Sequence, residues 1–259
     1  MKMKCKYCGK EYKLNDLEYI KNFPKFIQEK IKYIPDCNCL EKIQQEKFKQ
    51  EEIRLERKRV SNKIKKYKDV SIMDNKLMKS KFQTADMSDN HINLCKKYAE
   101  KFIKIGTAPK GLYLYGSVGT GKTFASACIA NYLMENGKTV LVMNLGLYLI
   151  KLQREWAEAE NDILNYVKNC DLLVIDDLGV EKVSEWVLDK VFTLIDTRYR
   201  AEKPLIVTTN LNLKGKENSI EDKFGIRAAD RIEEMCYSIK VIGESKRKRL
   251  KDEFLEFIA

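Results

Sequence analysis

The spacing of apolar residues changes near Pro109, and the change separates a polar stretch from a region of alternating patterns. After Pro109, short apolar runs bounded by turn residues alternate with longer segments in which apolar residues follow a helical period. Short buried runs are typical of parallel strands. The alternation therefore predicts an α/β domain in which helices flank a parallel sheet. Strands are expected at these apolar runs: 111–115, 139–143, 172–175 and 205–210.

The stretch before this region has parts of different character. Residues 41–70 are rich in charge and only loosely periodic, which predicts a solvated linking helix. Residues 74–89 are polar and mixed, so we expect a joint there, followed by a helix that begins at Asn90. We therefore expect a small module over residues 1–40, the linking helix over 41–70, and the α/β domain over 71–259.

The charge balance favours a polyanionic partner. The chain has 259 residues, with 49 Lys and Arg against 38 Asp and Glu, a formal net charge of +11. This excess favours nucleic acid, although a Lys-rich composition also arises from coding bias. The basic clusters at 57–59 and 63–68 fit either phosphate contacts or a solvated helix face. No apolar run reaches membrane-spanning length and no leader pattern is present, so we expect a cytoplasmic protein without a membrane partner.

The first four cysteines form two close pairs, Cys5-x-x-Cys8 and Cys37-x-Cys39. Two such pairs can supply the four thiolates of a structural zinc site, while free surface thiols or a redox pair are the alternatives. The single histidine, His91, is expected at the surface near a helix start. The remaining cysteines are isolated in apolar patterns and are expected to be buried core thiols: Cys95, Cys128, Cys170 and Cys236.

The strand expected at 111–115 runs directly into a glycine-rich loop with G-x-x-x-x-G-K-T spacing, and a helical pattern follows to Glu135. This context is typical of a P-loop that binds Mg-ATP, because its glycines let backbone N–H groups face the phosphates. Lys122 is expected to neutralise the β/γ charge, and the Thr123 hydroxyl to coordinate Mg²⁺. The nucleotide-binding residues are Gly116, Ser117, Val118, Gly119, Thr120, Gly121, Lys122 and Thr123.

Polar side chains end the third and fourth buried strands of the pattern. Asp176 and Asp177 close the run at 172–175, where a P-loop ATPase has its second metal-handling element. Asp176 is expected to hold the Mg²⁺ shell through water, and Asp177 to orient or deprotonate the attacking water. Asn210 ends the following strand, and its amide can bond both the lytic water and a γ-phosphate oxygen. An ordinary polar turn after a buried strand is the alternative.

Arg227 and Arg231 are spaced by one helical turn, so they lie on one face of a helix. An arginine there can reach the γ-phosphate bound by a neighbouring subunit. The alternative is a structural arginine that pairs with Asp230 or Glu234.

Taken in series, these motifs resemble the helicase-loader branch of the AAA+ ATPases, the DnaC/DnaI loaders and the IstB-like transposition ATPases. The resemblance covers residues 71–259, and the N-terminal cysteine module is similar in kind to the zinc-binding, helicase-contacting domain of DnaI-like loaders. The motifs that carry it are Gly116 to Thr123, Ile175-Asp176-Asp177-Leu178-Gly179, Asp196-Thr197-Arg198-Tyr199, Thr208-Thr209-Asn210 and the pair Arg227 and Arg231.

The resemblance implies further residue roles. Arg231 aligns with the arginine finger that acts in trans, accompanied by Arg227, and Arg247 aligns with a second nucleotide sensor or is part of a basic surface helix. A single helix near 245–257 follows the last strand, which implies a minimal C-terminal lid. In the family an added helix grips single-stranded DNA. The corresponding stretch here contains aromatic and basic residues: Tyr148, Lys151, Arg154 and Trp156. Packing in the core explains Tyr148 equally well.

The function implied is an ATP-dependent loader that places a replicative hexameric helicase on single-stranded DNA and uses ATP binding and hydrolysis for assembly and release. Its cofactors would be ATP, Mg²⁺ and Zn²⁺. The alternative is an IstB-like helper ATPase that acts on duplex DNA with a transposase. A non-catalytic adaptor that binds nucleotide only for structure is a third hypothesis, against which Asp177 and Asn210 argue.

Overall fold

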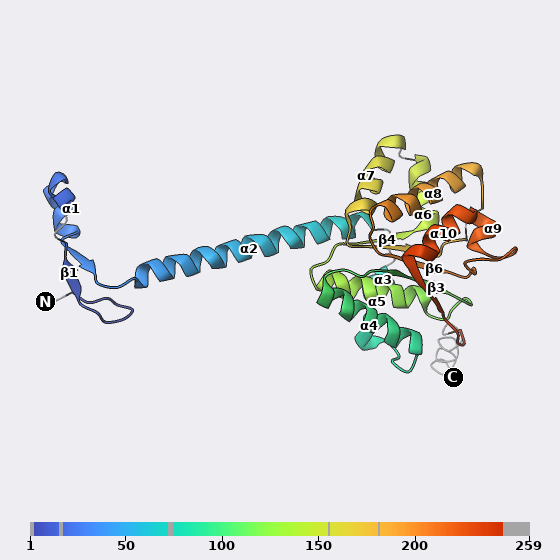
Figure 1. The fold of residues 1–259 in the computed structure, drawn as a ribbon, viewed down its shortest axis with the longest axis horizontal. Helices are drawn as coiled ribbons and strands as arrows, with labels where there is room; N and C mark the ends of the chain where they lie inside the picture. The colour runs from blue at the N-terminus through green and yellow to red at the C-terminus, as the bar shows by residue number, and fades with distance from the viewer. Residues whose placement is uncertain (1–2, 16–17, 72–74, 155, 181, 246–259) are drawn as a thin grey trace, which may run out of the picture. The chain divides into compact units, whose positions relative to one another are not determined.

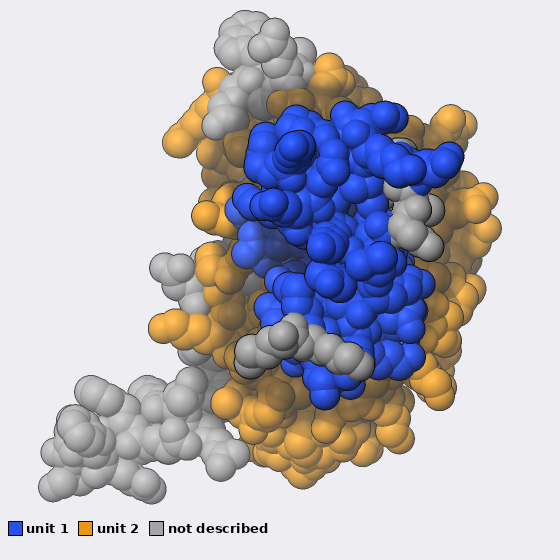
Figure 2. Space-filling view, turned by 90° about the vertical axis from the view of Figure 1, so that its left-hand side faces the viewer, with its two compact units in different colours: residues 1–59 blue, residues 60–259 orange. Residues whose placement is uncertain are grey.

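The computed structural model describes residues 3–15, 18–71, 75–154, 156–180 and 182–245 (Figure 1). The chain divides into two compact units, residues 1–59 and residues 60–259, which are coloured separately in Figure 2. The boundary between the two units falls inside one long helix.

The first unit is built on a two-stranded antiparallel sheet in which Tyr12 lies opposite Pro35 and Leu14 lies opposite Tyr33. Apart from Cys5 and Ile20, the described apolar residues before residue 59 are at least partly exposed, so the unit has little core of its own. Its elements are β1 (Tyr12–Leu14), the 3-10 helix η1 (Glu18–Asn22), α1 (Lys25–Lys30), β2 (Tyr33–Pro35) and the start of α2 (Cys39–Val70).

The helix α2 covers the segment for which a charged linking helix is expected. Up to residue 59 its side chains are exposed or half-buried. Its last turns are different, because Tyr67 is buried and its ring meets the ring of Tyr166 edge-on at 5.0 Å. The C-terminal end of α2 is therefore part of the core of the second unit.

The second unit contains a five-stranded sheet in the order β4-β5-β6-β3-β7, and every neighbouring pair is parallel. Its strands are β3 (Gly111–Tyr115), β4 (Val140–Asn144), β5 (Leu172–Asp176), β6 (Leu205–Thr209) and β7 (Cys236–Lys240). Its helices are α3 (Asn75–Met78), η2 (Phe82–Thr84), α4 (Asn90–Ile105), α5 (Lys122–Glu135), α6 (Leu145–Arg154), α7 (Trp156–Asn169), α8 (Glu185–Arg200), α9 (Ile220–Phe224) and α10 (Ile226–Met235).

Helices cover both faces of this sheet, as Figure 1 shows. Successive residues of a strand point to opposite faces, and in β5 Leu172 and Val174 pack with α4 and α5, whereas Leu173 and Ile175 pack with α6 to α10. Because both faces are buried, the strands read as continuous apolar runs rather than as alternating ones. The four sequence-predicted strands lie where they are expected, with the second shifted by one residue and the ends of the third and fourth differing by one residue.

One burial expectation from the sequence is wrong, and one pair of alternatives is resolved. His91 lies in the first turn of α4, as expected, but only 7% of it is exposed, so it is a buried residue and not a surface one. Tyr148, on α6, is fully buried in the core. Of the two alternatives for this residue, packing therefore holds, and its ring is not available to stack on bases. The isolated cysteines Cys95, Cys128, Cys170 and Cys236 are buried, as predicted.

Candidate nucleotide site and cysteine cluster

The sheet order brings the predicted nucleotide residues to one edge. β6 lies between β5 and β3, and the three strands are parallel, so their carboxyl ends are adjacent. The glycine-rich loop follows β3, Asp176 ends β5, and Asn210 follows β6. Crevices outside the carboxyl ends of parallel strands are the usual ligand sites of such sheets.

The backbone of the loop requires glycine where the sequence has it. Gly116 has φ 141°, and a Cβ there would overlap the carbonyl oxygen of Val241, which follows β7. Gly121 has φ 95° and forms the N-cap of α5, which begins at Lys122. The positive end of the helix dipole and its first N–H groups therefore face the loop, an arrangement that favours phosphate.

Lys122 connects the loop to the neighbouring strand. Its ammonium group is buried and donates hydrogen bonds to the carbonyl oxygens of Gly116 at 2.9 Å and Ser117 at 2.7 Å. It also donates to Asn210 Oδ1 at 2.8 Å. The structure thus brings together a predicted phosphate ligand and a predicted nucleotide sensor that are distant in sequence.

The two carboxylates after β5 are organised by β6. The Thr208 hydroxyl donates to Asp176 Oδ1 at 2.6 Å and accepts the N–H of Asp177 at 3.0 Å. Asp177 has φ 54°, so the chain turns sharply and the two carboxylates separate: Asp176 is buried and Asp177 is half-buried. The role of Thr208 in orienting these carboxylates does not follow from the sequence motifs. Two hydroxyl residues at the end of an otherwise apolar strand were the available signal.

The donor set at this edge fits Mg²⁺. Thr123, in the first turn of α5, offers a hydroxyl oxygen, and Asp176 offers a carboxylate held in place by Thr208. Mg²⁺ prefers hard oxygen ligands and is usually held by one or two protein groups together with phosphates and waters. The predicted roles of these two residues stay predictions.

The arginines of α10 have different surroundings. Arg227 is exposed, while Arg231 forms an ion pair with Asp196 of α8 and lies over the rings of Phe192 and Tyr199. The cis partner of Arg231 is therefore Asp196, and not Asp230 or Glu234 as the sequence alternative proposed. Arg247 and most of the expected C-terminal helix lie outside the described residues.

Arg198, which the sequence analysis noted only as part of a motif, is fully buried. Its guanidinium donates to the carbonyl oxygens of Val167, Cys170, Asp171 and Pro204 at 2.8 to 3.1 Å. Burial lowers the pKa of Arg198 from its ordinary value, and the nearby Cys170 opposes that shift. These contacts tie α8 to the C-terminal end of α7 and to the residue before β6, so Arg198 has a structural role.

The four N-terminal cysteines converge. β1 and β2 are antiparallel, so the chain before β1 and the chain after β2 meet at one end of the hairpin. The sulfur atoms of Cys5, Cys8, Cys37 and Cys39 all lie within 4.8 Å of one another. A tetrahedral zinc site with Zn–S bonds of about 2.3 Å places its sulfurs about 3.8 Å apart, so the cluster fits Zn²⁺.

The ionisation of these thiols also fits a metal site. Backbone N–H groups of Tyr7 and Cys8 lower the pKa of Cys5 to about 7. Hydrogen bonds with the Cys8 and Cys37 thiols raise the pKa of Cys39 to about 12. Thiolates so close together repel one another, and a bound divalent cation relieves that repulsion.

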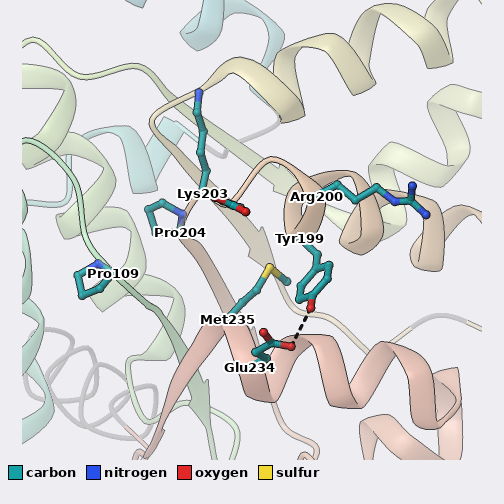
Figure 3. Close-up of a pocket in the computed structure, with 8 residues that line it drawn as sticks. Pro109, Tyr199, Arg200, Lys203, Pro204, Glu234 and Met235 are labelled. Atoms are coloured by element: carbon teal, nitrogen blue, oxygen red, sulfur yellow. Dashed lines mark hydrogen bonds between the residues drawn. The ribbon is translucent and has the colours of Figure 1, made fainter.

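Two open pockets lie outside the loop itself. One, of about 390 Å³, adjoins the turn after Asp177 and is lined by Gly179, Leu211 and Lys223, whose ammonium donates to the Gly179 carbonyl. The other, of about 290 Å³, lies at the opposite edge of the sheet, where Pro109 and Pro204 precede their strands (Figure 3). The second pocket therefore lies at the amino ends of β3 and β6, whereas the predicted phosphate ligands lie at the carboxyl ends.

Across the described residues, no helix combines the length and the apolar character needed to cross a membrane.

Comparisons with known proteins identify related chains. The profile of a family described as IstB-like ATP binding protein matches residues 37–254. The replicative helicase loader DnaI of Bacillus subtilis is 29% identical over 184 residues, which cover 66% of this chain and 59% of that protein. The replicative helicase loader DnaC of Escherichia coli K12 is 29% identical over 146 residues, which cover 55% of this chain and 57% of that protein. The match thus spans less than two thirds of either relative.

Solved structures show the same fold. The crystal structure of DnaI superposes with a TM-score of 0.55 at 25% identity and covers 68% of this chain and 94% of that one. The crystal structure of the DnaC helicase loader gives a TM-score of 0.55 at 24% identity, covers 65% of this chain and 100% of that one, and bears on the fold alone. The predicted α/β fold of the AAA+ type is confirmed.

Proposed function

The chain belongs to the family of IstB-like ATP-binding proteins, and from this premise we propose that it is an ATP-controlled loader of a replicative hexameric helicase. The observation that carries the proposal is the similarity to two proteins named replicative helicase loader, in sequence and, for DnaI, in structure at 25% identity. We also propose that the protein acts in the cytoplasm.

Nucleotide binding is proposed at the loop between β3 and α5. Backbone N–H groups at the start of α5 would hold the phosphates, and Lys122 would exchange its carbonyl contacts for phosphate oxygens. Mg²⁺ would supply charge neutralisation between the phosphates when bound. Thr123 and Asp176 would hold it, and Asp177 would orient the attacking water.

Asn210 is proposed to report the state of the nucleotide. It already bonds Lys122 at 2.8 Å, so a γ-phosphate that draws Lys122 away changes the partner of the amide. The backbone that follows Asn210 leads through the 211–219 loop to α9 and α10. We propose that this segment relays the state of the nucleotide to the arginines of α10.

Hydrolysis is proposed to require a second copy of the chain. Arg231, with Arg227 beside it, would stabilise the transition-state charge on the nucleotide of a neighbour, a contribution of about 10³- to 10⁵-fold in rate for arginine fingers. ATP binding would then drive assembly, and hydrolysis would drive release.

Single-stranded DNA is proposed to contact the exposed face of α6. Leu147 and Ile150 are exposed on this helix, and Arg154 ends it one turn later. A cation that contacts phosphates is typical of single-strand binding, and the two aliphatic side chains beside it would pack against the faces of the bases. This face replaces the buried Tyr148 in the contact that the sequence suggested.

The cysteine unit is proposed to bind zinc and to hold the helicase. Large apolar side chains of this unit are exposed, and Leu14 and Tyr33 form an exposed cross-strand pair. Exposed apolar side chains on a unit with little core are typical of a protein contact surface.

The test is capture of helicase by the full, zinc-loaded chain. The chain and a Cys5→Ser/Cys8→Ser variant would be compared against the replicative hexameric helicase and against a transposase with duplex DNA. A Lys6→Ser/Lys10→Ser variant of the same loop serves as the matched control, because it leaves the thiols in place. Capture of the helicase by the wild type and the control, and not by the cysteine variant, supports the loader. Capture of the transposase alone supports the IstB-like transposition function instead.

A further inference from the structure

The guanidinium of Arg231 rests in a cradle formed by its own chain. The cradle consists of Phe192, Asp196 and Tyr199, which lie on one face of α8 at the spacing of successive helical turns. The guanidinium carbon is 4.5 Å from the centre of the Phe192 ring and 5.3 Å from that of Tyr199. Nη1 makes an ion pair with Asp196 Oδ1.

The ion pair in this cradle is shielded from water. The Arg231 and Asp196 side chains are 22% and 18% exposed, and the two paired atoms, Nη1 and Oδ1, are buried. The Coulomb attraction between two charges is larger where they are removed from water than where they are exposed at the surface. Salt therefore screens this pair less than it screens the neighbouring pair of Asp196 with Arg200, whose side chain is 75% exposed.

The cradle is also fixed from the opposite helix. The Tyr199 hydroxyl donates to Glu234 Oε2 of α10 at 2.9 Å, as Figure 3 shows. The ring under the guanidinium is thus held by α8 through its backbone and by α10 through its hydroxyl. Arg227, one turn before Arg231 on α10, is exposed and has no comparable cradle among the described residues.

We propose that Asp196 is a positioning residue that holds Arg231 against α8 until a neighbouring chain brings ATP to it, and so sets the protein concentration at which hydrolysis begins. The proposal rests on the trans role of Arg231 proposed above. A guanidinium that is paired with a carboxylate can serve a neighbouring phosphate only by exchanging one anion for the other. Arg227 needs no such exchange, so it contacts the neighbour's nucleotide first, and Arg231 follows.

The experiment is ATPase activity as a function of protein concentration for the full chain and for Asp196→Asn. The substitution keeps the shape of the side chain and removes its charge. The half-maximal protein concentration is expected to fall roughly five- to tenfold, within the usual range of coupling between sites, while the maximal rate stays unchanged. A loss of maximal rate at an unchanged melting temperature overturns the proposal, as does an unchanged concentration dependence.

Further variants separate this effect from a loss of folding. Arg200→Gln removes the exposed partner of Asp196 and is expected to leave the concentration dependence unchanged. Asp196→Asn combined with Arg231→Ala is expected to match Arg231→Ala alone, because the effect acts through Arg231. If Asp196→Asn lowers the melting temperature, Phe192→Leu, which weakens the cradle and keeps the charge, is expected to shift the half-maximal concentration in the same direction. Failure to do so overturns the proposal.

The trans role itself has a distinct signature. A wild-type rate per chain that does not depend on protein concentration, together with full activity of Arg231→Ala, contradicts the proposed trans role. A wild type that depends on concentration, together with an Asp196→Asn variant that behaves like it, contradicts only the positioning role.

Discussion

Lys122 of the glycine-rich loop donates a hydrogen bond of 2.8 Å to Asn210, which directly follows β6. The two residues are far apart in sequence and meet because β3 and β6 are parallel neighbours. This bond makes the loop and the end of β6 one unit, in which a change at the phosphates alters the contacts of Asn210.

Asn210→Ala is expected to lower the rate of ATP hydrolysis about a hundredfold and to leave ATP affinity nearly unchanged. The reason is that a single well-placed polar group at the reacting phosphate contributes on this scale in the transition state, whereas Lys122 and the loop bind the ground state. Steady-state ATPase assays and equilibrium binding of a fluorescent ATP analogue measure the two quantities. A matched loss of affinity and rate would instead assign Asn210 to binding.

Thr208→Val is expected to lower the hydrolysis rate by about ten- to a hundredfold, because residues that orient a metal-handling carboxylate contribute on this scale. Valine keeps the shape of the side chain and removes the hydroxyl that bonds both Asp176 and the N–H of Asp177. ATPase assays at saturating Mg-ATP measure the effect. Thr107→Val, at an exposed position, is the control, and an equal effect of both variants would argue against the orienting role.

The fold and the loop could be read from the sequence because local patterns specify them. Short apolar runs define strands, and the spacing from Gly116 to Thr123 defines the loop whatever surrounds it. The role of Thr208 could not be read, since it depends on the β5–β6 register, in which Ile175 lies opposite Val207. That register places Thr208 beside Asp176.

Burial and long-range pairing were the least predictable features. Tyr148 lies on the inner face of α6, whereas Leu147 and Ile150 lie on the outer face, and the sequence of this short helix fits either orientation. Helical spacing offers Arg231 acidic partners on its own helix, whereas the structure supplies Asp196 from α8. Such pairings depend on helix packing, which local spacing does not encode.

Arg198→Lys is expected to lower the free energy of unfolding by at least about 3 kcal/mol. Lysine cannot span the carbonyl oxygens that the buried guanidinium bonds, and each buried acceptor left without a donor costs about 1 to 3 kcal/mol. Urea denaturation followed by circular dichroism measures the change. Arg200→Lys, two residues away and exposed, is expected to change stability by less than about 0.5 kcal/mol. Similar values for the two variants would refute the structural role of Arg198.

The zinc proposed for the cysteine cluster would hold the first unit folded, so a chelator is expected to unfold this unit and to leave ATP binding intact. The four-cysteine cluster replaces a core that the unit lacks, and structural zinc contributes on the order of 10 kcal/mol to folding such modules. Limited proteolysis would then cut before residue 38, while ATP affinity of the second unit persists. If the chelated chain resists proteolysis as the untreated chain does, the cluster is not a structural metal site.

Gly116→Ala is expected to reduce ATP affinity by more than about tenfold. A Cβ at Gly116 overlaps the Val241 carbonyl, and the residue has φ 141°, a conformation that costs a residue with a side chain about 1 to 3 kcal/mol. The loop would have to move away from β7, which displaces the N–H groups aimed at the phosphates. Isothermal titration with ATP measures the loss. Gly146→Ala is the matched control, because its Cβ meets only ordinary contacts inside α6 and alanine favours the helix. Unchanged affinity in Gly116→Ala would show that the loop tolerates the displacement and that its close approach to Val241 does not shape the phosphate site.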